Sequence, residues 1–275
     1  MSDALLTSAI SVRDLTKQYK TVQAVAGISF DVPKGSITAL LGGNGAGKTT
    51  TIAMLLGALI PTSGTVHILG HDMQRNRFAA LPRMNFSSPY VDIPKKLTVI
   101  ENLRVYGRLY NVPDLKNRIQ MMADELDLNE FITRPVGRLS AGQQTRVSLA
   151  KSLINAPEVL LLDEPTASLD PDTADRIRGY LQNYCTQHGM TILLASHNMR
   201  EVERLCSNVL MMKRGKIVDR GTPDDLVTRY GRRDMEEVFL DVARGTGNAA
   251  VLSDAGAEEG AQPHDAVPDR EGNVA

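Results

Sequence analysis

The sequence predicts an α/β protein, because short strand-like runs alternate with amphipathic helices up to about residue 242. Three observations support this fold class. The runs "SITALLG", "EVLLLD" and "TILLAS" are apolar almost throughout, which is typical of parallel strands covered on both faces. A glycine-rich loop follows the first run and leads into a helix. No strand candidate occurs between about residues 95 and 156, so a block of helices is expected to interrupt the sheet.

The composition excludes several classes of protein. Of the 275 residues, 42% are hydrophobic and 23% are charged, as in an ordinary globular protein. The formal net charge of -1 gives no reason to expect nucleic-acid binding. The longest apolar run, "IAMLLGALI", is far shorter than the ~20 residues that cross a bilayer, and the N-terminus does not resemble a secretory signal. The two cysteines, Cys185 and Cys206, are far apart in sequence and suit a reducing cytoplasm as inert thiols.

The first helix of the helical block has a recognisable start. Thr98 followed by Glu101 forms the pattern of a capping box. The residues expected on the buried face of this helix are Val99, Leu103, Tyr106 and Tyr110.

The glycine-rich loop "GGNGAGKT" matches the pattern G-x-x-x-x-G-K-[ST] and predicts a bound nucleoside triphosphate. Glycines let successive N–H groups point at phosphate oxygens, and the following helix adds the positive end of its dipole. Lys48 is expected to reach the β- and γ-phosphates, and the Thr49 hydroxyl to bind Mg²⁺. The predicted nucleotide-binding residues of this segment are Gly42, Gly43, Asn44, Gly45, Ala46, Gly47, Lys48, Thr49 and Thr50.

Two further strands end in polar residues that should reach the same edge of the sheet. "VLLLDEP" ends in two carboxylates, and α/β proteins place their ligands at the carboxyl ends of the strands. Asp163 is expected to hold Mg²⁺ directly or through water, and Glu164 is a candidate general base for the attacking water. "TILLASHNM" brings Ser196 and His197 to this edge, where His197 is expected to contact phosphate.

The segment "LSAGQQTR", residues 139–146, resembles a family signature. Together with the glycine loop, "LLLDEP", "SLD" and "SH" in this order, it makes residues 8–242 similar to the ATP-binding subunits of ABC transporters. The family signature usually reads L-S-G-G-Q, so Ala141 adds one methyl group that should be tolerated. The resemblance implies an α/β, P-loop ABC-type ATPase core with an antiparallel β subdomain and a helical subdomain that contains the signature.

The resemblance also implies roles for individual residues. Two ATP-binding subunits would pack head to tail, with each ATP between one phosphate loop and the partner's signature. The signature residues that would contact this ATP are Ser140, Gly142 and Gln143. Gly142 is expected to begin a helix whose N-terminus faces the phosphate. Tyr19 would stack on adenine, Asp170 would cross the dimer interface and His197 would contact the γ-phosphate, although Tyr19 alone is typical of a packing tyrosine.

Active hydrolysis is therefore expected. The catalytic residues would be Glu164, His197 and Lys48.

The expected domain organisation is one ABC ATPase domain over residues 1–242, with its helical subdomain at about 95–156 and C-terminal helices at about 222–242. The closing "RDMEEVFLDVAR" resembles the acidic-apolar helix of subunits paired with ABC-2-type exporters; the alternative is a helix that simply packs on its own domain. The residues on its apolar face are Met235, Val238, Phe239 and Val242. Residues 243–275 are rich in Gly, Ala, Asp and Glu and are expected to form a disordered acidic tail.

An ATPase without a predicted span is expected to act on other chains. The family offers membrane transporters and soluble machines of DNA repair, chromosome maintenance or translation. One ATPase unit, no Cys₄ site and no heptad run favour transport. "ITRPVGRLSAGQ" resembles subunits of ABC-2-type exporters, and an importer ATPase is the alternative. The expected partners are integral-membrane permease subunits and a second ATP-binding subunit, as a homodimer, at the cytoplasmic face of the membrane, with no nucleic acid.

The stretch "MNFSSPYVD", residues 84–92, departs from the family pattern, which usually has a Mg²⁺-contacting glutamine here. Ser88 is the nearest match, with Ser87 as an alternative. A serine is shorter, so it would need a shifted backbone or an intervening water to reach the metal; the alternative is that the metal contact is missing. Phe86 and Tyr90 are expected to help line a groove for a helix of the permease, and ordinary packing is the alternative.

Overall fold

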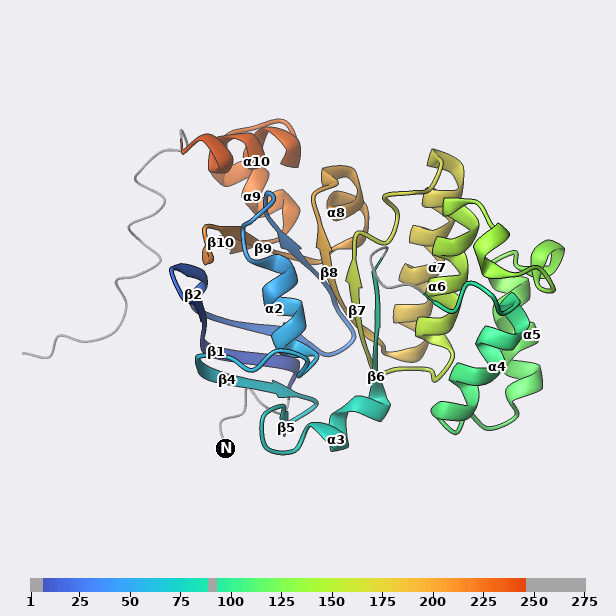
Figure 1. Ribbon diagram of the computed structural model, residues 1–275. Coiled ribbons are helices and arrows are strands. Elements are labelled where there is room, and N and C mark those ends of the chain that lie inside the picture. Colours follow the sequence, from blue (N-terminus) through green and yellow to red (C-terminus); the bar gives the residue numbers. More distant parts are fainter. Residues whose placement is uncertain (1–6, 89–92, 246–275) are drawn as a thin grey trace, which may run out of the picture.

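The computed structural model describes residues 7–88 and 93–245, which form two sheets surrounded by helices (Figure 1). The four-stranded antiparallel sheet contains, in spatial order, β2 (Val22–Pro33), β1 (Ser8–Tyr19), β4 (Ser63–Ile68) and β5 (His71–Asp72). The six-stranded sheet contains, in spatial order, β10 (Lys216–Gly221), β9 (Asn208–Lys213), β3 (Ile37–Leu41), β8 (Thr191–Ser196), β7 (Val159–Asp163) and β6 (Met84–Ser87). Only β10 pairs antiparallel within this second sheet.

Helices connect and cover these strands. The α-helices are α2 (Lys48–Leu55), α3 (Arg77–Ala80), α4 (Val99–Leu109), α5 (Leu115–Glu125), α6 (Ala141–Leu153), α7 (Pro171–His188), α8 (Met199–Leu205), α9 (Pro223–Tyr230) and α10 (Met235–Arg244). Short 3₁₀ turns occur at Leu81–Arg83, Asn129–Phe131 and Val136–Arg138. None of the described helices is long and apolar enough to cross a membrane.

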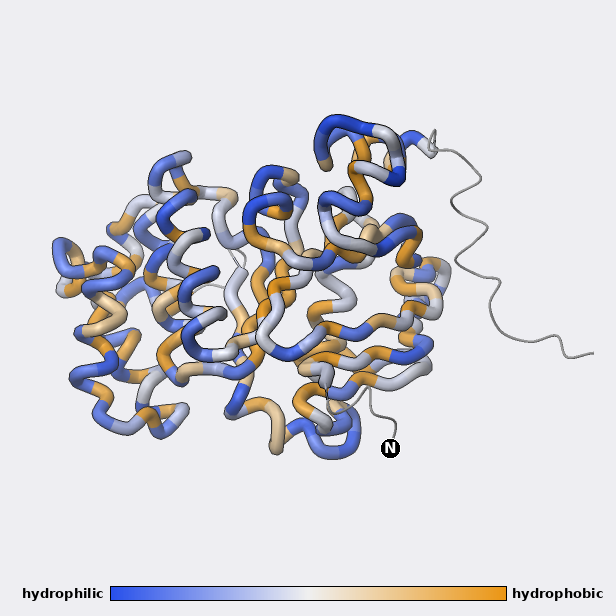
Figure 2. Tube along the Cα trace, turned by 180° about the vertical axis from the view of Figure 1, so that it is seen from behind, coloured by the Kyte–Doolittle hydropathy of each residue, from blue (hydrophilic) through white to orange (hydrophobic). Residues whose placement is uncertain are grey.

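The six-stranded sheet separates two hydrophobic cores. Because side chains alternate along a strand, Leu160 and Leu162 of β7 face one core while Val159 and Leu161 face the other. The first core packs the sheet against α4–α10, and the second packs it against α2 and the antiparallel sheet. The central strands appear as hydrophobic stretches in Figure 2, with hydrophilic residues on the outer turns. Burial on both faces explains why these strands are almost entirely apolar, and the α/β fold class is confirmed.

The helical block begins as expected from the sequence. Residues 95–156, all of them described, contain helices and 3₁₀ turns and no strand. The Thr98 N–H donates to Glu101 Oε2 at 2.8 Å and the Glu101 N–H donates to Thr98 Oγ1 at 3.3 Å, so the capping box is confirmed. Val99 and Leu103 are fully buried, and Tyr106 and Tyr110 pack partly against the first core.

One helix start differs from the sequence expectation. Helix α6 begins at Ala141, with Ser140 as its N-cap, and Gly142 is the second helical residue. The Ser140 side chain accepts a hydrogen bond from the Gln143 N–H, and this cap sets the helix start.

The C-terminal helices lie on the first core. Met235 and Val238 of α10 are fully buried, and Phe239 and Val242 are partly buried against the same core. The apolar face of α10 is thus packed on its own chain, as in the second of the two interpretations of this segment. The acidic tail lies outside the described residues from position 246 onward.

Candidate active site

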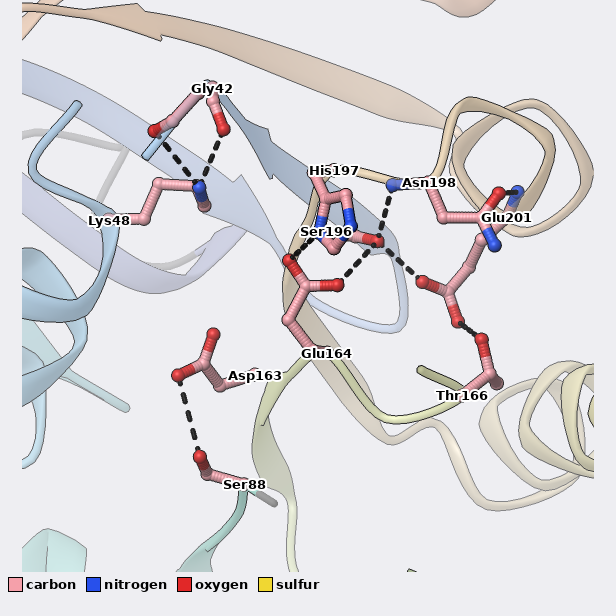
Figure 3. A network of polar contacts seen from close by, with 11 residues as sticks. Gly42, Lys48, Ser88, Asp163, Glu164, Thr166, Ser196, His197, Asn198 and Glu201 are labelled. Atoms are coloured by element: carbon pink, nitrogen blue, oxygen red, sulfur yellow. Dashed lines mark hydrogen bonds and ion pairs between the residues drawn. The ribbon is translucent and has the colours of Figure 1, made fainter. Parts of the chain in front are cut away.

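The candidate site forms where three parallel strands end side by side. Strand β8 lies between β3 and β7, and the register pairs Leu41 with Ser196 and Asp163 with Ala195. The glycine loop after β3 therefore meets the polar residues that follow β7 and β8. Figure 3 shows Lys48, Asp163, Glu164 and His197 converging on this edge.

The glycine loop fits closely between two strands. Gly47 has φ of +108°, and a Cβ there would lie 2.5 Å from the Ala24 carbonyl oxygen of β2. A Cβ on Gly42 would lie 2.5 Å from the Met212 carbonyl oxygen of β9. These contacts require glycine at both ends of the loop, because any side chain would collide with backbone.

Lys48 lies inside the loop. Its Nζ donates to the Gly42 carbonyl at 2.6 Å and to the Gly43 carbonyl at 3.3 Å. Burial lowers the pKa of Lys48, while the nearby carboxylates of Glu164 and Asp163 oppose that shift. An anion bound in the loop would stabilise this ammonium. Thr49 and Thr50 follow in the first turn of α2, with Thr49 exposed and Thr50 half-buried.

Asp163 is a buried carboxylate beside Ser88. Burial raises the pKa of Asp163, the negative charge of Glu164 adds to this, and Lys48 and Ser88 oppose it. The Ser88 hydroxyl, also buried, donates to Asp163 Oδ2 at 3.5 Å. A carboxylate and hydroxyl groups are the hard oxygen donors that Mg²⁺ prefers. Because a cation would also offset the burial of Asp163, these residues fit a divalent metal.

Glu164 and His197 are in direct contact. His197 Nδ1 lies 2.5 Å from Glu164 Oε1, and the Glu164 side chain is 12% exposed against 64% for His197. Glu164 has φ of +51°, a backbone conformation that costs of the order of 1 kcal/mol in a non-glycine residue. Its N–H donates to the Ala195 carbonyl at 2.9 Å, which holds the strained turn against β8. The Glu164 carboxylate thus lies at the strand ends beside the glycine loop, and the His197 imidazole contacts it from the solvent side.

The signature residues lie away from the glycine loop. Helix α6 packs on the first core and α2 on the second, so the two helix N-termini belong to opposite faces of the sheet. The side chains of Ser140 and Gln143 each bond the backbone of the other, and the Gly142 backbone lies close to Ser168 and Leu169. The structure therefore does not bring the signature to the nucleotide loop of the same chain.

Two other predicted contact residues have local partners. The Asp170 carboxylate accepts a hydrogen bond from the Thr173 N–H at 3.0 Å and caps α7. This hydrogen bond lowers the pKa of Asp170. Tyr19 ends β1, is 45% exposed, and has the Lys17 ammonium 5.2 Å from its ring centroid. Within the described part of the chain, neither residue contributes to the Lys48–Glu164 edge.

Several neighbours of the site were not identified from the sequence. A cavity of about 220 Å³ lies between the glycine loop, the β9–β10 turn and α10. The ammonium of Lys213, the last residue of β9, donates to the Val242 carbonyl of α10 at 2.6 Å. The apolar face of α10 was visible in the sequence, but its partner was not, because they are far apart in the chain. A larger cavity of about 800 Å³ between α4 and α5 is remote from the catalytic edge.

The strand before Ser88 is tied to the signature helix. Ser87 Oγ lies 3.1 Å from Ser148 Oγ of α6, which leaves Ser88 as the serine beside Asp163. The Lys151 ammonium of α6 donates to the Phe86 carbonyl at 3.3 Å. Phe86 itself packs partly against the second core, and Tyr90 lies outside the described residues.

Known proteins are similar to this chain in sequence. The family model described as ABC transporter matches residues 25–167. The chain is 37% identical over 237 residues to the Nod factor export ATP-binding protein I of Ralstonia nicotianae, covering 86% of this chain and 74% of that protein. It is 33% identical to the bacitracin transport ATP-binding protein BcrA of Bacillus licheniformis, covering 84% of this chain and 75% of that protein.

Solved structures show the same fold. An ATP-binding subunit of an ABC transporter aligns with a TM-score of 0.79 at 24% identity, covering 86% of this chain and all of that one. A dimeric ATP-binding cassette in a post-hydrolysis state, bound to ADP and Pi, aligns with a TM-score of 0.71 at 22% identity, covering 78% of this chain and 98% of that one.

The glycine loop, its lysine and the carboxylates at the neighbouring strand end define a P-loop ATPase. More narrowly, the chain belongs to the ABC transporter family and is one of its ATP-binding proteins. The family assignment made from the motifs is therefore confirmed.

The steric fit of the loop predicts the effect of one substitution. Gly47→Ala should lower the thermal midpoint of the protein, because the new Cβ would collide with the Ala24 carbonyl. The backbone φ at this position is also disfavoured for alanine, so the free energy of unfolding should fall by about 1–3 kcal/mol. Gly43→Ala is the matched control, since a Cβ there meets nothing within 4 Å. Differential scanning calorimetry of both variants measures the effect. Equal midpoints for the two variants would contradict the steric argument.

Proposed function

We propose that this chain hydrolyses ATP to power an ABC-2-type exporter. The observation that carries the proposal is the Glu164–His197 contact at 2.5 Å, at the strand ends that face the Lys48 loop. The relatives named for Nod factor export and bacitracin transport favour export over import. An importer ATPase is the alternative.

In the proposed reaction, Glu164 accepts a proton from the water that attacks the γ-phosphate. His197 holds the Glu164 carboxylate through Nδ1, and the exposed part of the imidazole ring faces the phosphate. Lys48 transfers its hydrogen bonds from the loop carbonyls to phosphate oxygens, which relieves the cost of its burial. When bound, Mg²⁺ would neutralise phosphate charge. Thr49 would hold this Mg²⁺, Asp163 would hold it directly or through water, and Ser88 would hold it through water.

A second copy of this chain completes the proposed site. The N-terminus of α6 lies on the face of the sheet opposite to α2, so the signature of one chain would act on the nucleotide of another. The residues assigned to this contact are Ser140, Gly142 and Gln143. Asp170 lies at the start of α7 and would cross the interface. The dimeric cassette with the same fold supports this arrangement.

The remaining assignments follow the same reasoning. The exposed ring of Tyr19 would stack on adenine in place of its contact with Lys17. We assign residues 1–242 to the ATPase domain, whose last helix, α10, extends two residues further, to Arg244. The partners would be integral-membrane permease subunits, which would hold the chain at the cytoplasmic face of the membrane.

Removing the proposed base tests the hydrolytic role. Glu164→Gln should lose most ATP turnover and accumulate as an ATP-bound dimer, because the amide cannot accept the proton. Phosphate release and size-exclusion chromatography in excess ATP measure the two effects. Glu130→Gln, at an exposed position in a 3₁₀ turn, is the control. Turnover close to that of the unmodified protein would remove Glu164 from the base role.

The two neighbouring serines separate a metal contact from packing. Ser88→Ala should raise the Mg²⁺ concentration needed for half-maximal hydrolysis by about 2- to 10-fold, as expected for one lost hydrogen bond. Ser87→Ala should leave this concentration unchanged, because Ser87 contacts Ser148 instead. Titration of MgCl₂ at fixed ATP measures both variants. Identical curves for Ser88→Ala and the unmodified protein would show that the metal contact is missing.

Purification from membranes tests the export assignment. The tagged chain, co-expressed with the membrane protein encoded next to its gene, should co-purify with that protein from detergent. The expected partner is a permease with six predicted spans and no substrate-binding protein beside it. Co-purification with an importer permease and its binding protein would instead support the alternative.

A further inference from the structure

A buried carboxylate lies behind the catalytic edge. Glu201, in the first turn of α8, is 1% exposed, and its N–H donates to Asn198 Oδ1. Glu201 Oε2 accepts a hydrogen bond from Ser196 Oγ at 2.6 Å, and Oε1 accepts one from Thr166 Oγ1 at 2.7 Å (Figure 3). One carboxylate oxygen is thus bonded to the end of β8 and the other to the loop after β7.

The end of β8 leads to the histidine. Ser196 is the last residue of β8 and directly precedes His197. The Ser196 hydroxyl also lies 3.5 Å from Glu164 Oε2 and accepts a hydrogen bond from the Asn198 N–H at 3.1 Å. The position of this one hydroxyl therefore influences both members of the Glu164–His197 pair.

The loop after β7 holds Thr166, two residues after Glu164. The Thr166 carbonyl accepts a hydrogen bond from the Leu169 N–H at 3.1 Å. Ser168 and Leu169 are the residues that lie against Gly142 of the signature helix. Glu201 is consequently connected to the catalytic edge on one side and to the neighbourhood of the signature on the other.

Burying the carboxylate of Glu201 costs free energy. Burial raises the pKa of Glu201. Hydrogen bonds from its two hydroxyl partners and the charge of Arg178 reduce this shift but do not reverse it. Buried charged groups usually contribute less to stability than apolar groups of the same size. An apolar side chain of similar size would fill the space but could not bond Ser196 and Thr166. The cost of burial suggests a role in the site rather than in folding alone.

We propose that Glu201 is a positioning residue that fixes the loops after β7 and β8 relative to each other, and so holds His197 against Glu164. The inference rests on the hydrolytic roles proposed for Glu164 and His197. The carboxylate does not touch the nucleotide; it acts by orienting the hydroxyls of Ser196 and Thr166.

Glu201→Gln is the main test, because it keeps the size of the side chain. Its amide has one acceptor and one donor group, so one of the two hydroxyls must reverse its hydrogen bond. Turnover at saturating ATP should fall by about 10- to 100-fold, the loss expected when reacting groups are misplaced by about 1 Å. The KM for ATP should change by less than about 3-fold, because the glycine loop and Lys48 are untouched.

A spectroscopic measurement separates positioning from general stability. In the full chain labelled at its 5 histidines, the imidazole resonances of His197 should shift in Glu201→Gln. His197→Ala identifies these resonances by their loss. Glu203→Gln is the matched control on the same helix, since its carboxylate bonds the Met235 N–H of α10. It should change neither the His197 resonances nor turnover.

Thr166→Val provides a second route that leaves Glu201 in place. It removes one hydroxyl without changing the shape of the side chain and should lower turnover in the same direction. In the double variant with Glu201→Gln the losses should be less than additive, because both act on one network. Unchanged turnover and unchanged His197 resonances in Glu201→Gln would overturn the proposal. Turnover lost in Glu164→Gln but not in Glu201→Gln would reject positioning while leaving the base assignment in place.

Discussion

The parallel pairing of β3, β8 and β7 is the constraint on which the site depends. Each strand is buried on both faces and, before its last residue, is apolar except for a threonine near its start in β3 and β8, so the charged side chains lie where the strands end. The shared direction then brings the glycine loop, the Asp163–Glu164 pair and the Ser196–His197 pair to one edge. Residues more than 150 positions apart in sequence meet because three short apolar strands lie in register.

Burial shapes the charges at this edge. It lowers the pKa of Lys48 and raises the pKa of Asp163, so the charged form of each group is disfavoured, and each partly offsets the burial of the other. A polyanion beside Lys48 and a cation beside Asp163 would each supply a charge of opposite sign. This charge would stabilise the buried ammonium or carboxylate in place of the water it has lost. Lys48 and Asp163 therefore stabilise each other only in part, and each is left able to bind a charged ligand.

Local patterns made the fold class and the individual motifs predictable. The glycine loop, the carboxylates after β7 and the cap at Thr98 all depend on residues close in sequence, and each pattern has one physical cause. The contacts that sequence could not predict join distant segments. Glu201 meets Thr166 across 35 positions, Ser87 meets Ser148 across 61, and α10 approaches the glycine loop from the end of the described chain. No spacing rule relates such pairs, because only the tertiary fold brings them together.

These long-range contacts connect the two faces of the sheet. The glycine loop adjoins the second core and the signature helix packs on the first, so the sheet lies between them. Two links lie at its edge. Ser87 and the Phe86 carbonyl join β6 to α6, beside Ser88 and Asp163. Thr166 lies in the loop that approaches Gly142, and its hydroxyl donates to Glu201. Glu201 in turn accepts a hydrogen bond from Ser196. The first link consists of hydrogen bonds, whereas the second joins the Glu201 hydrogen bonds to a van der Waals contact of Ser168 and Leu169 with Gly142. Because hydrogen bonds are directional, they fix β6 against α6 and Thr166 against Ser196.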